Sequence, residues 1–251
     1  MYAIKSFPSG SGAGLDGLRP AHLRDLTALK TGEAGATLRR ALQRLVNTMI
    51  RVETPLFIIR SVFGGSLCAL GKDASDVKSI AVGSTYRRLA TKVAIKPRSK
   101  GLGQDLGPVQ LGYGTQGGCE AAVHAVCEYL SVLTPNYVIV KLDVKNAFNS
   151  LDRRHILEII KNRAPRLYPI LRSAYLSPTP LFYGEHLISS ESGFQQGDPA
   201  GPAIFSLAVD EIARDVTAPL NIWYLHHMYI ASLSVDLSIS YVKILKELLH
   251  G

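Results

Sequence analysis

The run YVIVKL, which ends at Asp143, constrains the fold more than any other part of the sequence. A nearly continuous apolar run of this length predicts a central β-strand that is covered on both faces. A carboxylate at the end of a buried strand is costly unless it is paired or binds a metal. Asp143 is therefore a candidate metal ligand, although capping of the following NAFNSL turn is an alternative that the spacing leaves open.

The composition indicates a folded, basic protein. The chain has 251 residues, enough for one large domain or two small ones. Hydrophobic residues make up 47%, which excludes a disordered chain. Lysine plus arginine exceed aspartate plus glutamate by 28 to 20, giving a net charge of +8. This excess favours a polyanionic partner, nucleic acid before an anionic membrane, although an ordinary basic protein would carry it too.

Cysteine usage and hydropathy bear on the compartment. Cys68, Cys119 and Cys127 lack the CxxC spacing of a zinc site and are too few for a disulfide framework, so they predict a reducing environment. No apolar run approaches the roughly 20 residues that a membrane span needs. The N-terminal segment lacks the apolar core of a signal peptide. We therefore expect a cytoplasmic or nuclear protein with no membrane partner.

Helices and strands follow from the spacing of apolar residues and from turn signals. Helices are predicted to begin near Pro20, after Ser84 and after Asp152, and to present the apolar sets Leu38, Leu42, Leu45, Met49 and Ala122, Val126, Tyr129, Leu130, Leu133. VFGGSLCAL and SIAVGS predict two strands on either side of a polar turn at 71–78. TPLFYGEHLISSES predicts a hairpin turning at Gly184 and Glu185, and LNIWYL predicts a strand that leads to His226 and His227.

A second candidate site lies in the stretch GFQQGDPAGP. Gly197 and Pro199 predict a sharp entry into a helix whose first amides have no partner within the helix. Such a helix end attracts phosphate. An ordinary loop-to-helix junction has the same residues, so this stretch by itself leaves both interpretations open.

Taken together, these segments resemble a known family. KLDVKNAFNSLDR resembles the first catalytic motif of reverse transcriptases, and GFQQGDPAGPAIFSLAVD resembles the second. SLCALGKD followed by KSIAVGSTYRRLATK resembles the fingers of non-LTR retrotransposon polymerases, and QLGYGTQGGCEAAVHAV resembles the segment that follows the fingers. LNIWYL resembles the strand before the third motif. The resemblance runs from about residue 12 to residue 227 in the family's order.

The resemblance implies an α+β fold, the fingers and palm of a right-hand polymerase, in which an antiparallel palm sheet packs helices on one face. We expect an N-terminal helical extension at 1–50, a fingers-like region at 51–135 and a palm-like region at 136–251. Residues 228–251 match only loosely. The palm is therefore expected to be incomplete and the thumb to be missing, as in a fragment or decayed copy of a retroelement polymerase.

The resemblance also implies a reaction, the template-directed addition of deoxynucleotides to a primer on RNA or DNA. Two Mg²⁺ ions about 3.5–4 Å apart would clamp the attacking and leaving oxygens, held in part by Asp143 and the carbonyl of Val144. Phe148 would be a catalytic-site residue that excludes a ribose 2′-hydroxyl. The remaining residues implied for nucleotide binding are Lys72 and Lys78 at the triphosphate, and Gln195, Gly197, Asp198 and Pro199 around the new base pair.

Two departures from the family pattern bear on activity. The third motif reads Tyr-x-Asp-Asp in the family and Tyr224-Leu225-His226-His227 here. Imidazole suits zinc, copper or iron better than magnesium. Adjacent strand residues point to opposite faces, so we expect the two histidines not to chelate one metal together. In the fingers, Lys78-Ser79 replaces Arg-Pro and one extra residue separates Lys72 from Lys78. The sequence therefore predicts impaired catalysis.

Two other functions remain open on the sequence. The first is a catalytically dead nucleic-acid-binding remnant, which the basic charge favours. The second is a dinucleotide-binding enzyme, because GYGTQG at 112–117 fits G-x-G-x-x-G before a helix. Asp143, however, lies 26 residues after Gly117, rather than the about 20 of that motif.

Several single residues have simpler interpretations. His124 is expected to pack within a helix, and His155 and His186 to lie on the surface. Trp223 is expected in the core. Arg87 and its neighbour Arg88 suit either a solvated helix face or contact with a template.

Overall fold

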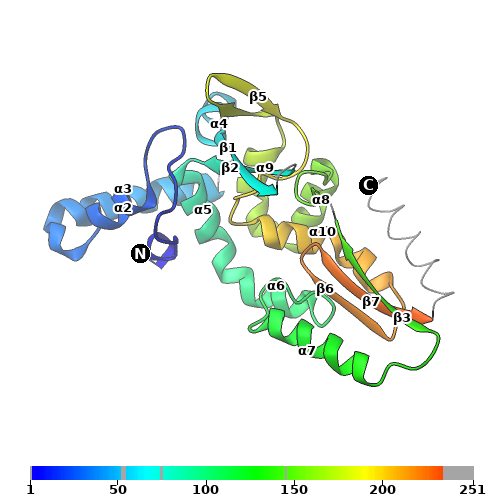
Figure 1. The fold of residues 1–251 in the computed structure, drawn as a ribbon. Helices are drawn as coiled ribbons and strands as arrows, with labels where there is room; N and C mark the ends of the chain where they lie inside the picture. Colours follow the sequence, from blue (N-terminus) through cyan, green and yellow to red (C-terminus); the bar gives the residue numbers. More distant parts are fainter. Residues whose placement is uncertain (1, 52–54, 74–75, 145, 234–251) are drawn as a thin grey trace. The chain divides into compact units, whose positions relative to one another are not determined.

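The computed structural model describes residues 2–51, 55–73, 76–144 and 146–233. The chain folds into two compact units. The first comprises Met1–Pro97 and Ile160–Gly201, and the second comprises Arg98–Ile159 and Pro202–Gly251. Each unit contains helices and one β-sheet (Figure 1). The three segments expected from the sequence are divided differently, and their assignment to fingers and palm stays a prediction.

Helices make up most of the first unit. They are α1 (Tyr2–Lys5), α2 (Pro20–Leu26), η1 (Leu29–Thr31), α3 (Gly32–Arg51), α4 (Leu56–Val62), α5 (Thr85–Ile95), η3 (Pro165–Leu167) and α9 (Tyr168–Tyr175). The helix start at Pro20 is confirmed, as is the N-cap at Ser84, whose Oγ accepts from the Arg87 amide. The apolar face of α3 was predicted incorrectly at one position. Val46 is buried there, whereas Leu45 is 41% exposed.

The sheet of the first unit is mixed, with strand order β2-β1-β4-β5. Its strands are β1 (Gly65–Asp73), β2 (Asp76–Gly83), β4 (Thr179–Tyr183) and β5 (His186–Ser190). The predicted turn at 71–78 is wrong for most of its length, because β1 and β2 continue through it as an antiparallel pair. The register shifts between Gly71 and Asp73, the break expected where one strand carries an extra residue. The hairpin turn at Gly184 and Glu185 is confirmed.

The second unit contains a three-stranded sheet of order β3-β7-β6, antiparallel throughout. Its elements are η2 (Lys96–Arg98), which leads into it from the first unit, α6 (Ser99–Leu106), α7 (Gly118–Ser131), β3 (Tyr137–Asp143), α10 (Gly201–Asp215), β6 (Leu220–Tyr224) and β7 (His227–Leu233). The helix α8 (Arg153–Arg163) carries the chain back into the first unit. Its predicted N-cap is confirmed, because Asp152 Oδ1 accepts from the His155 amide at 2.7 Å.

Hydrophobic clusters cover both faces of this sheet. Trp223 and Met228 pack with Phe205 and Val209 of α10 on one face. Residues Leu220, Ile222 and Ala231 pack with Ala122, Val126 and Tyr129 of α7 on the other. Helices therefore lie on both faces, and the expectation of helices on one face is wrong. The core position of Trp223 is confirmed, since it is fully buried.

The strand β3 lies at an edge of the sheet, so the prediction of a central strand is wrong. Val140 and Leu142 pack toward one cluster and Ile139 toward the other, which accounts for the nearly continuous apolar run. Every residue of β3 nevertheless remains half-buried or exposed, because no strand flanks it on its outer side among the described residues. The apolar run thus indicated that both faces of β3 are covered, whereas the position of β3 in the sheet depends on strand pairing.

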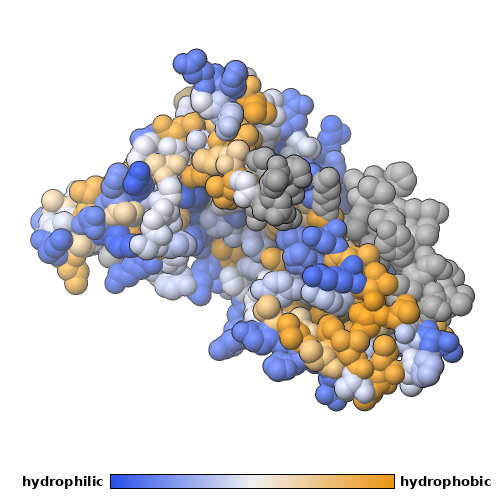
Figure 2. Space-filling model, in the orientation of Figure 1, coloured by the Kyte–Doolittle hydropathy of each residue, from blue (hydrophilic) through white to orange (hydrophobic). Residues whose placement is uncertain are grey.

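The outer face of α7 carries exposed hydrophobic residues. Val123 and Leu130 of this helix and the following Val132 are 51–66% exposed. Figure 2 shows hydrophobic residues gathered over α7 and the adjoining strands. His124 is also exposed on α7, contrary to its predicted packing, whereas the predicted exposure of His155 and His186 is confirmed. No helix in the described ranges has the length and apolar character required to cross a bilayer.

Candidate metal and nucleotide site

Asp143 is positioned by the pairing of β3 with β7. It is the last residue of β3, and its Cα partner on β7 is His227. The next amide, that of Val144, donates to the carbonyl of His226 at 3.1 Å. Asp143 therefore lies directly opposite the turn that joins β6 to β7, with its side chain 54% exposed.

The two histidines lie on the same side of Asp143. His226 Nε2 is 3.7 Å from Asp143 Oδ1, and His227 Nδ1 is 3.4 Å from the same oxygen. The imidazole rings are 4.2 Å apart between centroids, and one ligand atom from each of the three side chains lies within 4.8 Å of the others. The premise that the two histidines point to opposite faces is therefore wrong. It assumed two adjacent strand residues, but His226 belongs to the turn, where alternation does not apply.

Gln110 holds this turn, and the sequence reasoning missed it. Its Oε1 accepts from the amide of Leu225 at 2.8 Å, and its Nε2 donates to the carbonyl of Leu225 at 3.4 Å. Leu225 has a φ of +54°, a left-handed backbone conformation that residues other than glycine rarely adopt. Gln110 is fully buried. The available signal was a polar glutamine within an apolar stretch. Its hydrogen-bond partner in the turn, Leu225, is too far along the chain to be found from the sequence.

Aromatic rings form one wall of the cluster. The chain turns at 146–149, and Phe148 packs against Phe205 at 5.3 Å between ring centroids. His226 stands edge-on to both rings, at 5.9 Å from Phe148 and 6.3 Å from Phe205. The structure therefore brings Phe148 beside Asp143 and the histidines, as the chain spacing suggested, and its role against a ribose hydroxyl stays a prediction.

A second set of predicted site residues lies in the first unit, around Arg87. The Arg87 guanidinium donates to Asp198 Oδ2 at 2.6 Å, to Tyr175 Oη at 2.7 Å and to Gln195 Oε1 at 2.5 Å. It also donates to the carbonyl of Phe63 at 2.7 Å. Arg87 is 2% exposed, so both predicted roles, a solvated face and a template contact, are wrong. The Gln195 and Asp198 side chains are buried with it and point into the protein.

Electrostatics explains why this buried charge is stable. Burial alone would lower the pKa of the Arg87 guanidinium, but its interactions with Tyr175 and Asp198, which include a hydrogen bond with each, raise that pKa above the ordinary value. Burial also raises the pKa of the Tyr175 hydroxyl well above its ordinary value, so the hydroxyl stays protonated and donates to Asp198 Oδ2 at 2.6 Å. The cluster is a complete hydrogen-bonded ion pair.

Gly197 brings the same loop against β2. The loop carbonyl of Gln196 accepts from the Ala81 amide at 2.9 Å. Gly197 has a φ of +115°, and a Cβ there would lie 2.8 Å from the Ala81 carbonyl oxygen. Glycine is therefore required for the close approach. Pro199 follows at a half-buried position, and Asp198 Oδ1 accepts from the Ala200 amide just before α10.

The chain matches a known protein family. A model of the family described as reverse transcriptase (RNA-dependent DNA polymerase) matches residues 72–235. The chain belongs to the reverse transcriptase family. No curated protein matches the chain. The mixed α and β architecture, with an antiparallel sheet carrying Asp143, is compatible with a reverse transcriptase palm.

Reverse transcriptases use divalent metal ions, and the residues here do not fit a magnesium pair. Magnesium prefers oxygen ligands in octahedral geometry. Among the described residues, the potential metal ligands that come together at this site are one carboxylate and two imidazoles. A single carboxylate provides neither the negative charge nor the bridging oxygens that two dications require. The donor set of this reverse transcriptase domain therefore disagrees with two-magnesium chemistry.

The fingers lysines are only partly described. The backbones of Lys72 and Lys78 lie in β1 and β2, where Lys78 pairs with Leu70. The side chains of both lysines lie outside the described part of the structure. Contact of these lysines with a triphosphate stays a prediction.

The glycines of GYGTQG are explained by backbone packing. A Cβ on Gly112 would lie 2.5 Å from the Leu225 amide nitrogen, and Gly114 packs against Gly103 of α6. A dinucleotide-binding unit needs a strand before the first glycine. Residues 98–111 contain α6 and the isolated bridge residue Gln110, and no strand. Gly112 therefore allows close approach to the turn that presents His226, Gly114 allows packing on α6, and Gly117 is the N-cap of α7.

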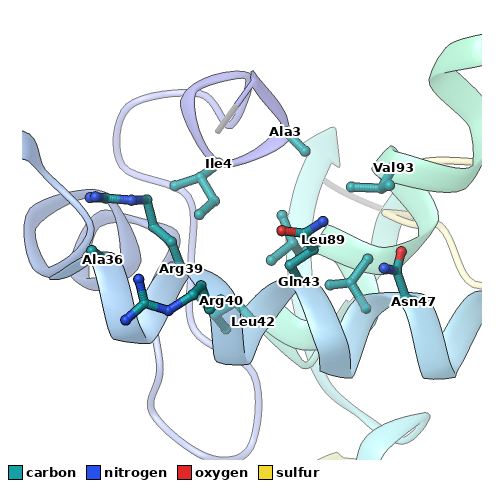
Figure 3. Close-up of a pocket in the computed structure, with 11 residues that line it drawn as sticks. Ala3, Ile4, Ala36, Arg39, Arg40, Leu42, Gln43, Asn47, Leu89 and Val93 are labelled. Carbon is teal, nitrogen blue, oxygen red and sulfur yellow. The ribbon is translucent and has the colours of Figure 1, made fainter. Parts of the chain in front are cut away.

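The first unit also contains a cavity of about 560 Å³ between α1, α3 and α5 (Figure 3). Apolar side chains share its lining with the polar groups of Arg39, Arg40, Gln43 and Asn47. Arg39 donates to the carbonyl of Thr27, and Arg40 pairs with Glu33. None of the predicted site residues lines this cavity.

Proposed function

We propose that the chain is a reverse transcriptase domain of the non-LTR retrotransposon type whose nucleotidyl transfer is impaired. The observation that carries the proposal is the pairing of Asp143 with His227 across β3 and β7, beside His226. This is the position at which the family pattern calls for two further carboxylates. Losing the charge of two carboxylates weakens the binding of two dications by several kcal/mol, and each 1.36 kcal/mol corresponds to about tenfold in rate.

The other site residues keep their proposed roles. Phe148, beside Asp143, would exclude a ribose 2′-hydroxyl. Gly197 and Pro199 would border the new base pair. Gln195 and Asp198 would act indirectly, because their buried contacts with Arg87 fix the shape of the loop.

Primer extension on an RNA template with Mg²⁺ and deoxynucleotides tests the proposal. The native chain would be compared with the double variant His226→Asp, His227→Asp. We expect extension by the double variant at least about 100-fold above the native chain, since the metal ligands are restored. Adding Asp143→Asn to the double variant should abolish the gain. Extension by the native chain at the level of the double variant would contradict the proposal.

A second candidate, nucleic-acid binding without catalysis, is favoured by the net charge of +8. Phosphate contacts release counterions, so the affinity for RNA should fall steeply as salt increases. Fluorescence anisotropy with a labelled RNA duplex at several salt concentrations measures this slope. The absence of binding at low salt would exclude this function.

A further inference from the structure

We propose that Asp143, His226 and His227 form a site for a single Zn²⁺ ion, in place of the magnesium pair. The inference rests on the proposed function only in that both assign the two histidines to the metal position. It requires no polymerase activity, nucleotide or template. It follows from the donor atoms, their spacing and the way in which the backbone holds them.

The donor atoms match zinc. The group offers two imidazole nitrogens and one carboxylate oxygen. Two histidines and one carboxylate are a donor set that zinc uses in sites with an open position. Imidazole also binds Zn²⁺ in preference to Mg²⁺, which favours oxygen ligands.

The spacing of the donor atoms also matches. Ligands at about 2.0–2.1 Å from a tetrahedral zinc ion lie about 3.3–3.4 Å from one another. Asp143 Oδ1 is 3.4 Å from His227 Nδ1 and 3.7 Å from His226 Nε2. The carboxylate oxygen therefore needs a shift of only a few tenths of an ångström relative to each imidazole nitrogen, and the two nitrogens, which lie within 4.8 Å of each other, must close to the same spacing.

The backbone holds the three ligands on a connected framework. Asp143 and His227 are paired across two strands, and the carbonyl of His226 accepts from the Val144 amide. Gln110 bonds both backbone groups of Leu225, the residue before His226. Ligands fixed in this way lose little conformational entropy when a metal binds.

Solvent reaches the carboxylate of the site, whereas the His227 Nδ1 that would bind the ion is itself buried and has no hydrogen-bond partner among the described residues. The side chains are 54% exposed at Asp143, 31% at His226 and 37% at His227. Three protein ligands leave one tetrahedral position for water or for an anionic oxygen. The rings of Phe148 and Phe205 cover His226 on its apolar side.

Isothermal titration of the purified chain with ZnCl₂, in buffer containing excess Mg²⁺, tests the site. We expect one Zn²⁺ per chain. His227→Ala and Asp143→Asn should each weaken the affinity by at least about 10-fold, because each removes one of three ligands. His155→Ala is the matched control, since this exposed histidine of the second unit should leave the affinity unchanged. Circular dichroism would verify that each variant is folded, and His227→Gln would replace a variant that is not.

The exposed thiols of Cys68, Cys119 and Cys127 require a separate control. The titration would be repeated after alkylation of the cysteines, and the stoichiometry should remain one. Absence of zinc binding, binding that survives both ligand variants, or binding that alkylation abolishes would each overturn the proposal. The titration contains no template or nucleotide, so it can succeed or fail whatever the outcome of primer extension.

Discussion

The Arg87 cluster and the Asp143 cluster each place a carboxylate beside nitrogen-containing side chains. They differ in how exposed these side chains are and in how closely their polar atoms approach. The side chains of Arg87 and Asp198 are 2% and 1% exposed and lie 2.6 Å apart. The side chain of Asp143 is 54% exposed, and its nitrogen neighbours lie at 3.4 and 3.7 Å. The first cluster is closed by its own hydrogen bonds, whereas the second leaves space between its polar atoms.

Burial and hydrogen bonding distinguish a charge cluster that stabilises the fold from one that can bind a ligand. A buried ion pair is tolerated only when hydrogen bonds satisfy its remaining atoms, and such a cluster has no capacity left for a ligand. A half-exposed cluster with donors more than 3.3 Å apart can admit an ion. Sequence motifs placed Asp143 and Asp198 in one catalytic centre, and the structure gives them opposite kinds of surroundings.

The substitution Asp198→Asn should have the largest effect on stability. An asparagine amide cannot accept hydrogen bonds at both former oxygens, so the Arg87 charge would be left uncompensated in the interior. We expect a loss of about 3–5 kcal/mol in the free energy of unfolding. Urea denaturation followed by circular dichroism measures it. Asp143→Asn is the matched change in the second cluster and should stay within about 0.5 kcal/mol. Equal losses from the two substitutions would remove the distinction.

The substitution Gln110→Ala should have an intermediate effect and act on both stability and metal binding. It leaves the partly buried amides of Leu225 and Gly112 without their acceptor, which costs about 1–3 kcal/mol. It also frees the turn that carries His226, so zinc affinity should fall roughly 10-fold with every ligand still present. Thermal melting and zinc titration measure the two effects. Gln104→Ala, at an exposed position of α6, should change neither.

The substitution Tyr175→Phe should have the smallest effect at neutral pH, about 1 kcal/mol, because the hydroxyl loses its hydrogen bonds with Arg87 and Asp198 while these two residues stay bonded to each other. Its signature is the pH dependence. Burial raises the folded-state pKa of Tyr175 above its ordinary value of about 10, so the folded state keeps a proton that the unfolded state releases. The stability of the native chain should therefore fall as the pH rises above about 10.

Urea denaturation from neutral to alkaline pH would test this dependence. The variant should show a shallower decline than the native chain, because it has no hydroxyl to titrate at this position. Tyr183→Phe, at an exposed position, should keep the native profile. A native decline that Tyr175→Phe leaves unchanged would show that other groups govern alkaline unfolding.

The positions of most elements could be predicted from the sequence. The helix caps at Ser84 and Asp152, the hairpin at Gly184 and the strands at 137–143 and 220–224 were all predicted, because capping and apolar runs are local signals. The predicted turn at 71–78 was wrong, because a run of polar residues is typical of loops but also occurs in paired strands. The edge position of β3 depends on pairing with β7, a contact between segments about 90 residues apart.

Some features of the candidate site likewise followed from the sequence, and others only from the structure. The sequence by itself determined the membership in the reverse transcriptase family, the acid at the end of β3 and the replacement of two carboxylates by histidines, because these are matters of residue type and order. Only the tertiary structure decided that Arg87 is a buried partner of Asp198, that Gln110 holds the turn, and that His226 and His227 face the same oxygen. The orientation of a side chain depends on where its strand ends and on which distant backbone groups bond to the following turn, and neither is written in local spacing.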